Sequence, residues 1–185
     1  MIIQRTGHPS AELVTIAECH AHLRVEPYDN SGTHPDDAMI LAMLASAREH
    51  CENFLGFALA VQTYQGALDQ FPAGAIEFPV SPLVSIQSIT AAGVLVDAAD
   101  YTVDTFGARA LPVTVWPTVA TDTNTIRILF TAGGGLLPFA ARAAMLLTLT
   151  HLYEQRSDST ERQAYTLPSG AEALLRPLRQ RRGMA

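Results

Sequence analysis

Lysine is absent from this 185-residue sequence, cysteine occurs only twice, and charged residues make up only 16% of the chain. No apolar run reaches the ~18 residues that a membrane-spanning helix needs. The opening residues Met1–Arg5 lack the apolar stretch of a signal peptide. Two cysteines are too few for a disulfide framework. These absences argue against a membrane protein and a disulfide-rich secreted domain. They predict a protein that stays in the cytoplasm unless something larger carries it out.

The composition and the charge pattern are informative. A hydrophobic fraction of 48% in 185 residues suits one globular domain with a real core. Residues 1–175 carry eight arginines and 18 acidic residues, a net charge of −10, whereas residues 176–185 carry four arginines and no acidic residue. The acidic body argues against nucleic-acid binding over the whole surface. The basic end allows docking on an acidic partner or contact with phosphate.

Three stretches have the spacing of buried or amphipathic helices. Thr15, followed three residues later by Glu18, predicts a capping box and a short helix that continues to Val25. A longer helix is expected over residues 36–55, with Gly56 as its end. Its apolar face is predicted at Ile40, Leu44, Ala47, Cys51 and Phe54 or Leu55. A third helix over residues 138–153 is apolar on nearly all sides, so we expect it to be the most buried element. A short last helix is predicted over residues 170–178.

The middle of the chain has the shorter period of β-strands. The predicted strands cover residues 61–64, 75–78, 84–90, 101–104, 113–116 and 126–130. Proline, glycine or aspartate separates them, and Pro79, Pro82 and Pro117 lie where a central strand could not accept them. The pattern predicts a meandering antiparallel region.

The predicted fold class is α+β, mainly α: a small helical bundle with an antiparallel β insertion between the second and third helices. We expect one domain over residues 1–185. Its parts are an N-terminal arm (1–14), helices (15–57), the β insertion (60–132), helices (138–178) and a basic C-terminal tail (179–185).

Candidate chemistry is sparse. Cys19, His20, His22, His50 and Cys51 are metal-ligand types, but they lack the paired spacing of structural zinc sites, and on helices they diverge. Gly133–Gly135 follows a strand as a phosphate-binding loop would, yet no lysine follows and no G-x-G-x-x-G is present. We interpret it as a turn between strand and helix. No metal and no cofactor is expected.

Catalytic patterns are equally absent. The sequence has no G-x-S-x-G element and no recognisable Ser, His and Asp set. The acidic residues of the β region have no partner motif and indicate solvated edges; they are Glu77, Asp97, Asp100 and Asp104. We therefore expect no enzyme activity.

Two features could bind a partner. Trp116, beside Pro117 and with Tyr101, could form a binding ledge, although such a tryptophan more often closes the core of a small sheet. The C-terminal arginines are either a solvated tail or a partner-binding site; they are Arg176, Arg179, Arg181 and Arg182.

The order of these pieces resembles the head–tail connector proteins, also called adaptor or head-completion proteins, of long-tailed double-stranded DNA phages, prophages and gene transfer agents. The resemblance covers roughly residues 13–178. Its markers are the Thr15–Val25 and Asp36–Phe57 segments with the Gln62-Thr63 strand, Phe78-Pro79, Pro82-Leu83 before Ser85–Thr90, Asp100–Val103, Phe130–Gly133, His151–Arg156 and Leu167–Gly170. The Ala108–Thr125 stretch departs from the pattern.

The resemblance implies a structural role. Such connectors form a ring, expected to be dodecameric, beneath the portal protein at the neck of the particle. The ring extends the channel through which double-stranded DNA passes without specific binding, and it offers a platform to the stopper or tail-side neck protein. Assembly is expected in the bacterial cytoplasm, with no membrane partner. The alternatives are a tail-side completion or assembly protein that acts as a monomer or small oligomer, and a small enzyme with an unrecognised site.

Overall fold

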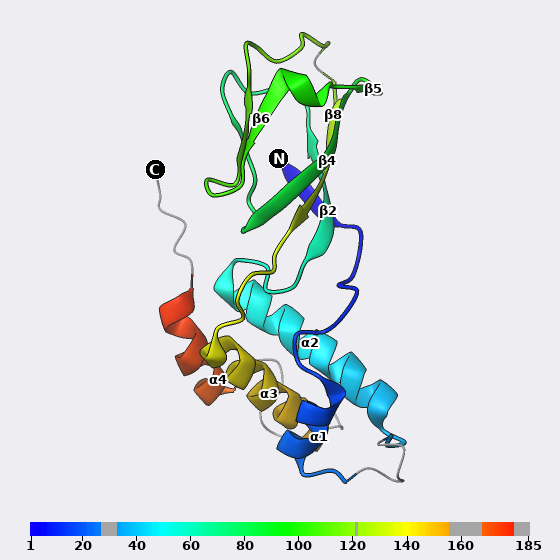
Figure 1. The fold of residues 1–185 in the computed structure, drawn as a ribbon, viewed down its shortest axis with the longest axis vertical. Helices are drawn as coiled ribbons and strands as arrows, with labels where there is room; N and C mark the ends of the chain where they lie inside the picture. Colours follow the sequence, from blue (N-terminus) through cyan, green and yellow to red (C-terminus); the bar gives the residue numbers. More distant parts are fainter. Residues whose placement is uncertain (27–32, 121, 156–167, 180–185) are drawn as a thin grey trace. The chain divides into compact units, whose positions relative to one another are not determined.

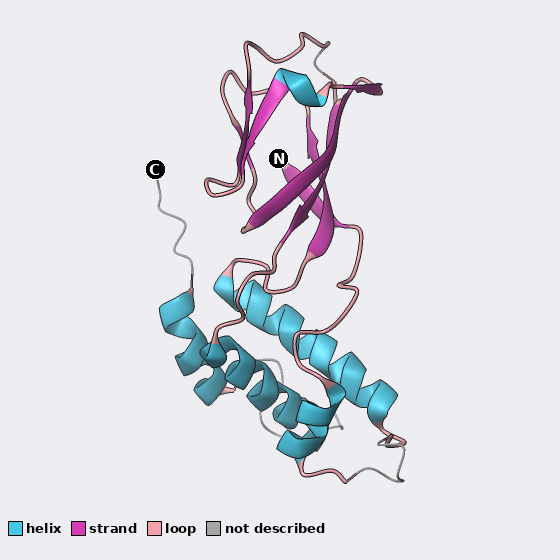
Figure 2. Cartoon of the chain, in the orientation of Figure 1, coloured by secondary structure: helices cyan, strands magenta, loops and turns pink. Residues whose placement is uncertain are grey.

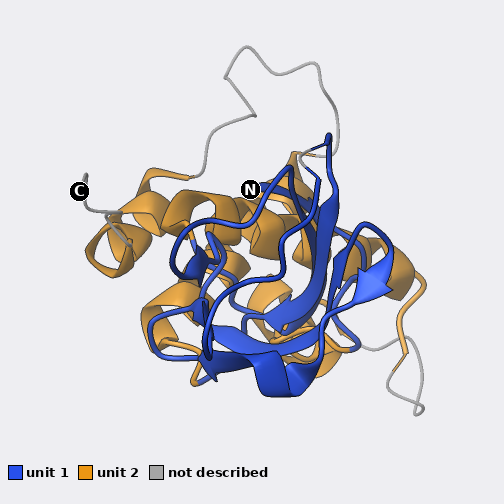
Figure 3. Ribbon diagram, turned by 90° about the horizontal axis from the view of Figure 1, so that it is seen from above, with its two compact units in different colours: residues 1–10, 57–135 blue, residues 11–56, 136–185 orange. Residues whose placement is uncertain are grey.

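The computed structural model describes residues 1–26, 33–120, 122–155 and 168–179. The chain divides into two compact units, shown in different colours in Figure 3. Unit 1 comprises residues 1–10 and 57–135, and unit 2 comprises residues 11–56 and 136–185. Within the described residues, all eight β-strands belong to unit 1 and all four α-helices to unit 2 (Figures 1 and 2). The α+β class is confirmed, although strands form a larger part than a mainly helical chain would have.

Unit 2 begins with the capped helix that the sequence predicts. Helix α1 spans Ile16–Leu23, and the Thr15 hydroxyl accepts a hydrogen bond from the backbone N–H of Glu18 at 3.3 Å. The Glu18 carboxylate in turn accepts from the backbone N–H of Thr15 at 2.9 Å. This reciprocal pair satisfies two helix-end donors, so the predicted capping box is confirmed.

Helix α2, Asp37–Leu55, provides the main apolar face of unit 2. All five positions of its predicted face are fully buried: Ile40, Leu44, Ala47, Cys51 and Leu55. Gly56 ends the helix in a left-handed conformation with φ 78°, as predicted. Helix α3, Phe139–Glu154, packs on α2, and α4, Ser169–Leu175, packs on α3 before the short 3₁₀ turn Arg176–Leu178.

Helix α3 is less buried than its composition indicates. Its buried residues recur at three- and four-residue spacing on one side, and they are Ala141, Ala144, Met145, Thr148 and Leu149. On the other side Leu147 is 38% exposed and Phe139 is 91% exposed. The expectation that this helix is the most buried element is therefore wrong, because only one face packs on α2 and α4 while α2 buries a longer stripe.

A charged side chain lies in the interior of unit 2, and the sequence pattern does not predict its burial. Arg48 on α2 is 1% exposed. Its guanidinium donates to both carboxylate oxygens of Glu12, at 3.0 and 3.3 Å, and to Glu52 at 3.0 Å. Such bidentate pairing compensates the loss of hydration of the buried cation. The ion pair ties the segment before α1 to the middle of α2.

The larger sheet of unit 1 has the strand order β1-β2-β8-β4-β5, antiparallel throughout. Its strands are Ile2–Arg5, Gln62–Leu68, Ile126–Ala132, Leu83–Ala91 and Val94–Leu95. The antiparallel prediction is confirmed, but the order is not a meander. Strand β8 lies between β2 and β4 in this sheet. Strands β3, β6 and β7, which lie between β2 and β8 in the sequence, form a second sheet. The segment expected as an arm supplies edge strand β1, whose residues pair with β2.

The second sheet has the order β3-β7-β6, formed by Ile76–Glu77, Arg109–Pro112 and Tyr101–Asp104. The predicted strand at residues 113–116 is wrong. Pairing with β6 ends at Pro112, and beyond it Val113 and Val115 are exposed whereas Trp116 turns inward. The inner faces of both sheets enclose one apolar core, which includes Ile76, Ile89, Trp116, Ile128 and Phe130.

Candidate interaction surfaces

The C-terminal arginines were the predicted partner-binding residues, and the structure describes two of them. Arg176 is exposed and donates to Glu172 on α4 at 3.1 Å. Arg179 places its guanidinium 5.3 Å from the ring centre of Phe54 on α2, within the range of a cation–π contact. Arg181 and Arg182 lie outside the described residues. The two described arginines thus each have an intramolecular contact, and both remain solvent-accessible.

The residues of metal-ligand type do not converge. Burial raises the pKa of Cys19 to about 11 and that of Cys51 to about 12, as expected for thiols in an apolar interior. His20 is buried and contacts Asp37 at 2.5 Å, whereas His22 and His50 are exposed. Among the described residues no group of three or more His, Cys, Asp or Glu side chains could hold a metal ion.

The Gly133–Gly135 turn uses its backbone donors internally. The N–H of Gly133 donates to the carbonyl of Pro82 at 2.8 Å, and the N–H of Gly134 donates to that of Leu59 at 3.0 Å. A Cβ at Gly133 would lie 1.9 Å from the carbonyl oxygen of Ala60, and its φ is +101°. Glycine is required here by close backbone packing, and two of the amides that a phosphate would need are already occupied.

Two of the acidic residues of unit 1 that the sequence analysis named act in local structure. Asp104 accepts from the backbone N–H of Gly107 and from Arg109, and these bonds hold the pKa of its carboxyl below the ordinary value. Asp97 accepts from the backbone N–H of Ala99 and caps a 3₁₀ turn, Ala98–Asp100.

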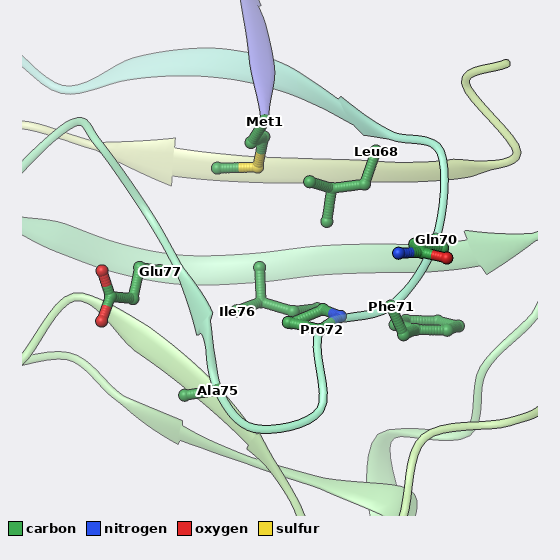
Figure 4. A pocket seen from close by; sticks show the side chains of 8 residues that line it. All are labelled: Met1, Leu68, Gln70, Phe71, Pro72, Ala75, Ile76 and Glu77. Atoms are coloured by element: carbon green, nitrogen blue, oxygen red, sulfur yellow. The ribbon is translucent and has the colours of Figure 1, made fainter.

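Trp116 belongs to the core, as the commoner of the two interpretations predicts. It stacks on Phe71 with 4.9 Å between ring centres, and its indole N–H donates to the carbonyl of Gly74 at 2.7 Å. An open pocket of about 390 Å³ in unit 1 is lined in part by Phe71, the stacking partner of Trp116 (Figure 4). The side chains that line it are Met1, Leu68, Gln70, Phe71, Pro72, Ala75, Ile76 and Glu77. A single carboxylate among apolar side chains does not amount to a catalytic arrangement.

Large apolar side chains that the sequence analysis did not single out are fully or mostly exposed. In unit 1, Phe106 projects from the turn between β6 and β7, and Val115 follows β7. In unit 2, Leu136 and Phe139 lie at the start of α3 and are each more than nine-tenths exposed. A phenylalanine inside a polar turn such as Asp104–Gly107 is a signal that could have been read from the sequence. Singly exposed apolar side chains are normal on protein surfaces, and only a contiguous patch marks an interaction site.

Comparison with solved structures gives full-length matches. A chain from the neck of an empty gene transfer agent (GTA) particle, computed with C6 symmetry, matches with TM-score 0.76 and 24% identity over 100% of this chain and 98% of that chain. The chain has the fold of this neck chain. A chain of the native GTA neck computed with C12 symmetry matches at TM-score 0.74 and 21% identity, and one from the virion of a native GTA particle at 0.71 and 22%. Both comparisons cover 100% of this chain and 98% of the other.

No family model and no curated protein matches the chain. The shared fold therefore rests on three-dimensional similarity. None of the helices described is long and apolar enough to cross a membrane.

Proposed function

We propose that this chain is a non-enzymatic structural protein of the neck of a phage-like particle of the gene-transfer-agent kind. In this proposal it forms a ring beneath the portal, extends the DNA channel and provides the platform for the stopper or tail. The observation that carries the proposal is the match to GTA neck chains along the whole length of both proteins. A likeness confined to a helical bundle or a β-sandwich would carry much less weight, because such pieces recur in unrelated proteins.

Two further observations support a ring that surrounds DNA. The similar neck chains come from assemblies computed with C6 and C12 symmetry. The body of this chain has a net charge of −10, which opposes adhesion to phosphate and suits a channel through which DNA must slide. Arginines at the C-terminal end are the candidates for binding the portal or a ring neighbour.

The decisive experiment is a pull-down of the full chain with its cognate portal, followed by electron microscopy of the complex. We expect a ring of this chain on the portal. Binding to a tail-side neck protein, with no binding to the portal, would instead favour the tail-side completion or assembly role. Failure to bind any neck protein would contradict both.

Deletion of residues 177–185 is expected to leave the fold intact and to weaken portal binding by about tenfold or more, because Arg179 and the basic residues after it are lost. Particles that carry the deletion should fill with DNA but leak or lack tails. The matched variant ends at Arg179, so it keeps the contact with Phe54 and lacks Arg181 and Arg182. Thermal melting checks the fold and a portal-binding titration checks the contact. Unchanged portal binding by the longer deletion would show that the tail is only a solvated end.

A further inference from the structure

The outer face of the larger sheet in unit 1 has an unusual composition. None of its five strands contains an aspartate or glutamate at any position, although acidic residues outnumber arginines 18 to 12 in the chain. On the central strand β8, Ile126 and Ile128 are fully buried while Arg127 between them is exposed. Strand alternation therefore places Arg127 on the outer face. We call this outer surface the Arg127 face.

The other outward register positions of β2, β4 and β8 are uncharged. The apolar ones include Ala67, opposite Arg127 on β2, and Leu129 on β8. The polar ones are Thr63, Gln65, Ser85, Ser88, Thr90 and Thr131. The hydroxyls of Ser85 and Thr131 are 2.7 Å apart, and Thr90 donates to the carbonyl of Arg127 at 3.3 Å. These bonds keep the side chains close to the sheet. The Arg127 guanidinium forms no ion pair with any residue that the structure describes.

The outer face of the second sheet has the opposite charge. Glu77 and Asp104 flank Arg109 in register across the three strands, and their inward neighbours are buried or partly buried in the core. Arg109 pairs with Asp104 at 2.8 Å. Asp100 is exposed and continues this face, because its carbonyl accepts from the N–H of Val113, one position beyond the last β6–β7 pair. This acidic face thus carries three carboxylates, Glu77, Asp100 and Asp104, and one arginine. Glu77 and Asp100 form no ion pair within the described part of the chain.

We propose that, in the ring of the proposed function, the Arg127 face of one copy packs against the acidic face of the next copy. A closed ring requires two different surfaces of the same chain to meet head to tail, and unit 1 presents two faces of opposite charge. An arginine without an ion pair, on a sheet whose strands carry no carboxylate, is complementary to the carboxylates of Glu77 and Asp100.

Other occupants fit this face less well. Double-stranded DNA is bound through several phosphate contacts, and the Arg127 face offers one arginine. Two copies joined by this same face would place one Arg127 against the other, and such a two-fold contact makes a pair instead of a ring. A second copy that presents its acidic face provides the opposite charge and makes the head-to-tail contact that a ring requires.

Charge reversal on each face tests the pairing. The variants are R127E, which makes the Arg127 face negative, and E77R/D100R, which makes the acidic face positive. Sedimentation velocity of the full chain over a wide concentration range measures self-association. We expect each variant alone to associate about tenfold or more weakly than the wild type, because like charges then meet. An equimolar mixture should associate again, since the faces of alternating copies are complementary. The combined variant R127E/E77R/D100R should also recover.

Two control variants separate charge pairing from misfolding. R127K keeps the charge and should associate like the wild type. E154R reverses an exposed acidic residue on α3 and should have no effect. The proposal is overturned if R127E associates normally, if neither the mixture nor the combined variant recovers, or if the wild type stays monomeric throughout. A portal pull-down of the same proteins tests the proposed function separately. If R127E forms a normal ring on the portal, only this interface is rejected and the proposed function stands.

Discussion

Replacement of Arg48 by methionine is expected to destabilise unit 2 by about 3–5 kcal/mol, the range for breaking a buried ion pair from one side. The substitution would leave the carboxylates of Glu12 and Glu52 without the guanidinium that bonds to both. Methionine fills similar space, so the loss would come from the uncompensated charges and only slightly from packing. The combined variant R48M/E12Q/E52Q removes those charges and should recover most of the stability.

Urea unfolding with two probes measures this effect and also tests the domain organisation. Far-UV circular dichroism reports mainly the helices of unit 2, whereas the single tryptophan, Trp116, lies in unit 1. If residues 1–185 form one cooperative domain, as we predict, R48M should move both transitions together. If only the helix transition moves, the two units unfold separately and the single-domain prediction is wrong. No shift in either probe would contradict the stabilising role of Arg48.

Leu149→Asp is expected to give insoluble or unfolded protein. Leu149 is fully buried on α3, and an unpaired carboxylate there would cost several kcal/mol in addition to the lost apolar contacts. Leu147→Asp is the matched control, since Leu147 lies on the same helix and is 38% exposed. Soluble yield and thermal melting of the two variants provide the comparison. Equal soluble yield and equal melting temperatures of the two variants would show that the face of α3 that contains Leu149 does not pack in the core.

Local features of the sequence predict the helices well. The capping box at Thr15 and the glycine stop at Gly56 depend on residues a few positions apart, and both are present in the structure. Helix α3 was less well predicted because an apolar composition does not tell which side another helix covers. Residues such as Phe139 are apolar and nevertheless exposed.

Strand pairing was less predictable because the partners are distant in sequence. Strand β1 pairs with residues about sixty positions later, and β2 pairs with β8 at a similar separation. Nothing in residues 1–14 indicates this partner. The burial of Arg48 likewise depends on Glu12, 36 residues away. The absence of acidic residues from the five strands of the larger sheet could have been read from the sequence, but only the sheet order shows that they form one surface.

Unit 2 is formed by two segments of the chain, residues 11–56 and 136–185, that are separated by most of unit 1. This separation affects how long apolar surface is exposed while the chain is synthesised on the ribosome. The apolar face of α2 is complete at Leu55, but the helix that covers it begins at Phe139. Roughly 80 residues must therefore be translated in between, which takes about 4–16 s at bacterial and eukaryotic elongation rates of about 5–20 residues per second. During that interval the strands of unit 1 emerge and can pair while α2 remains uncovered. The nascent chain thus exposes the apolar face of α2 for seconds, a period in which it is open to aggregation or to binding by chaperones that hold apolar segments.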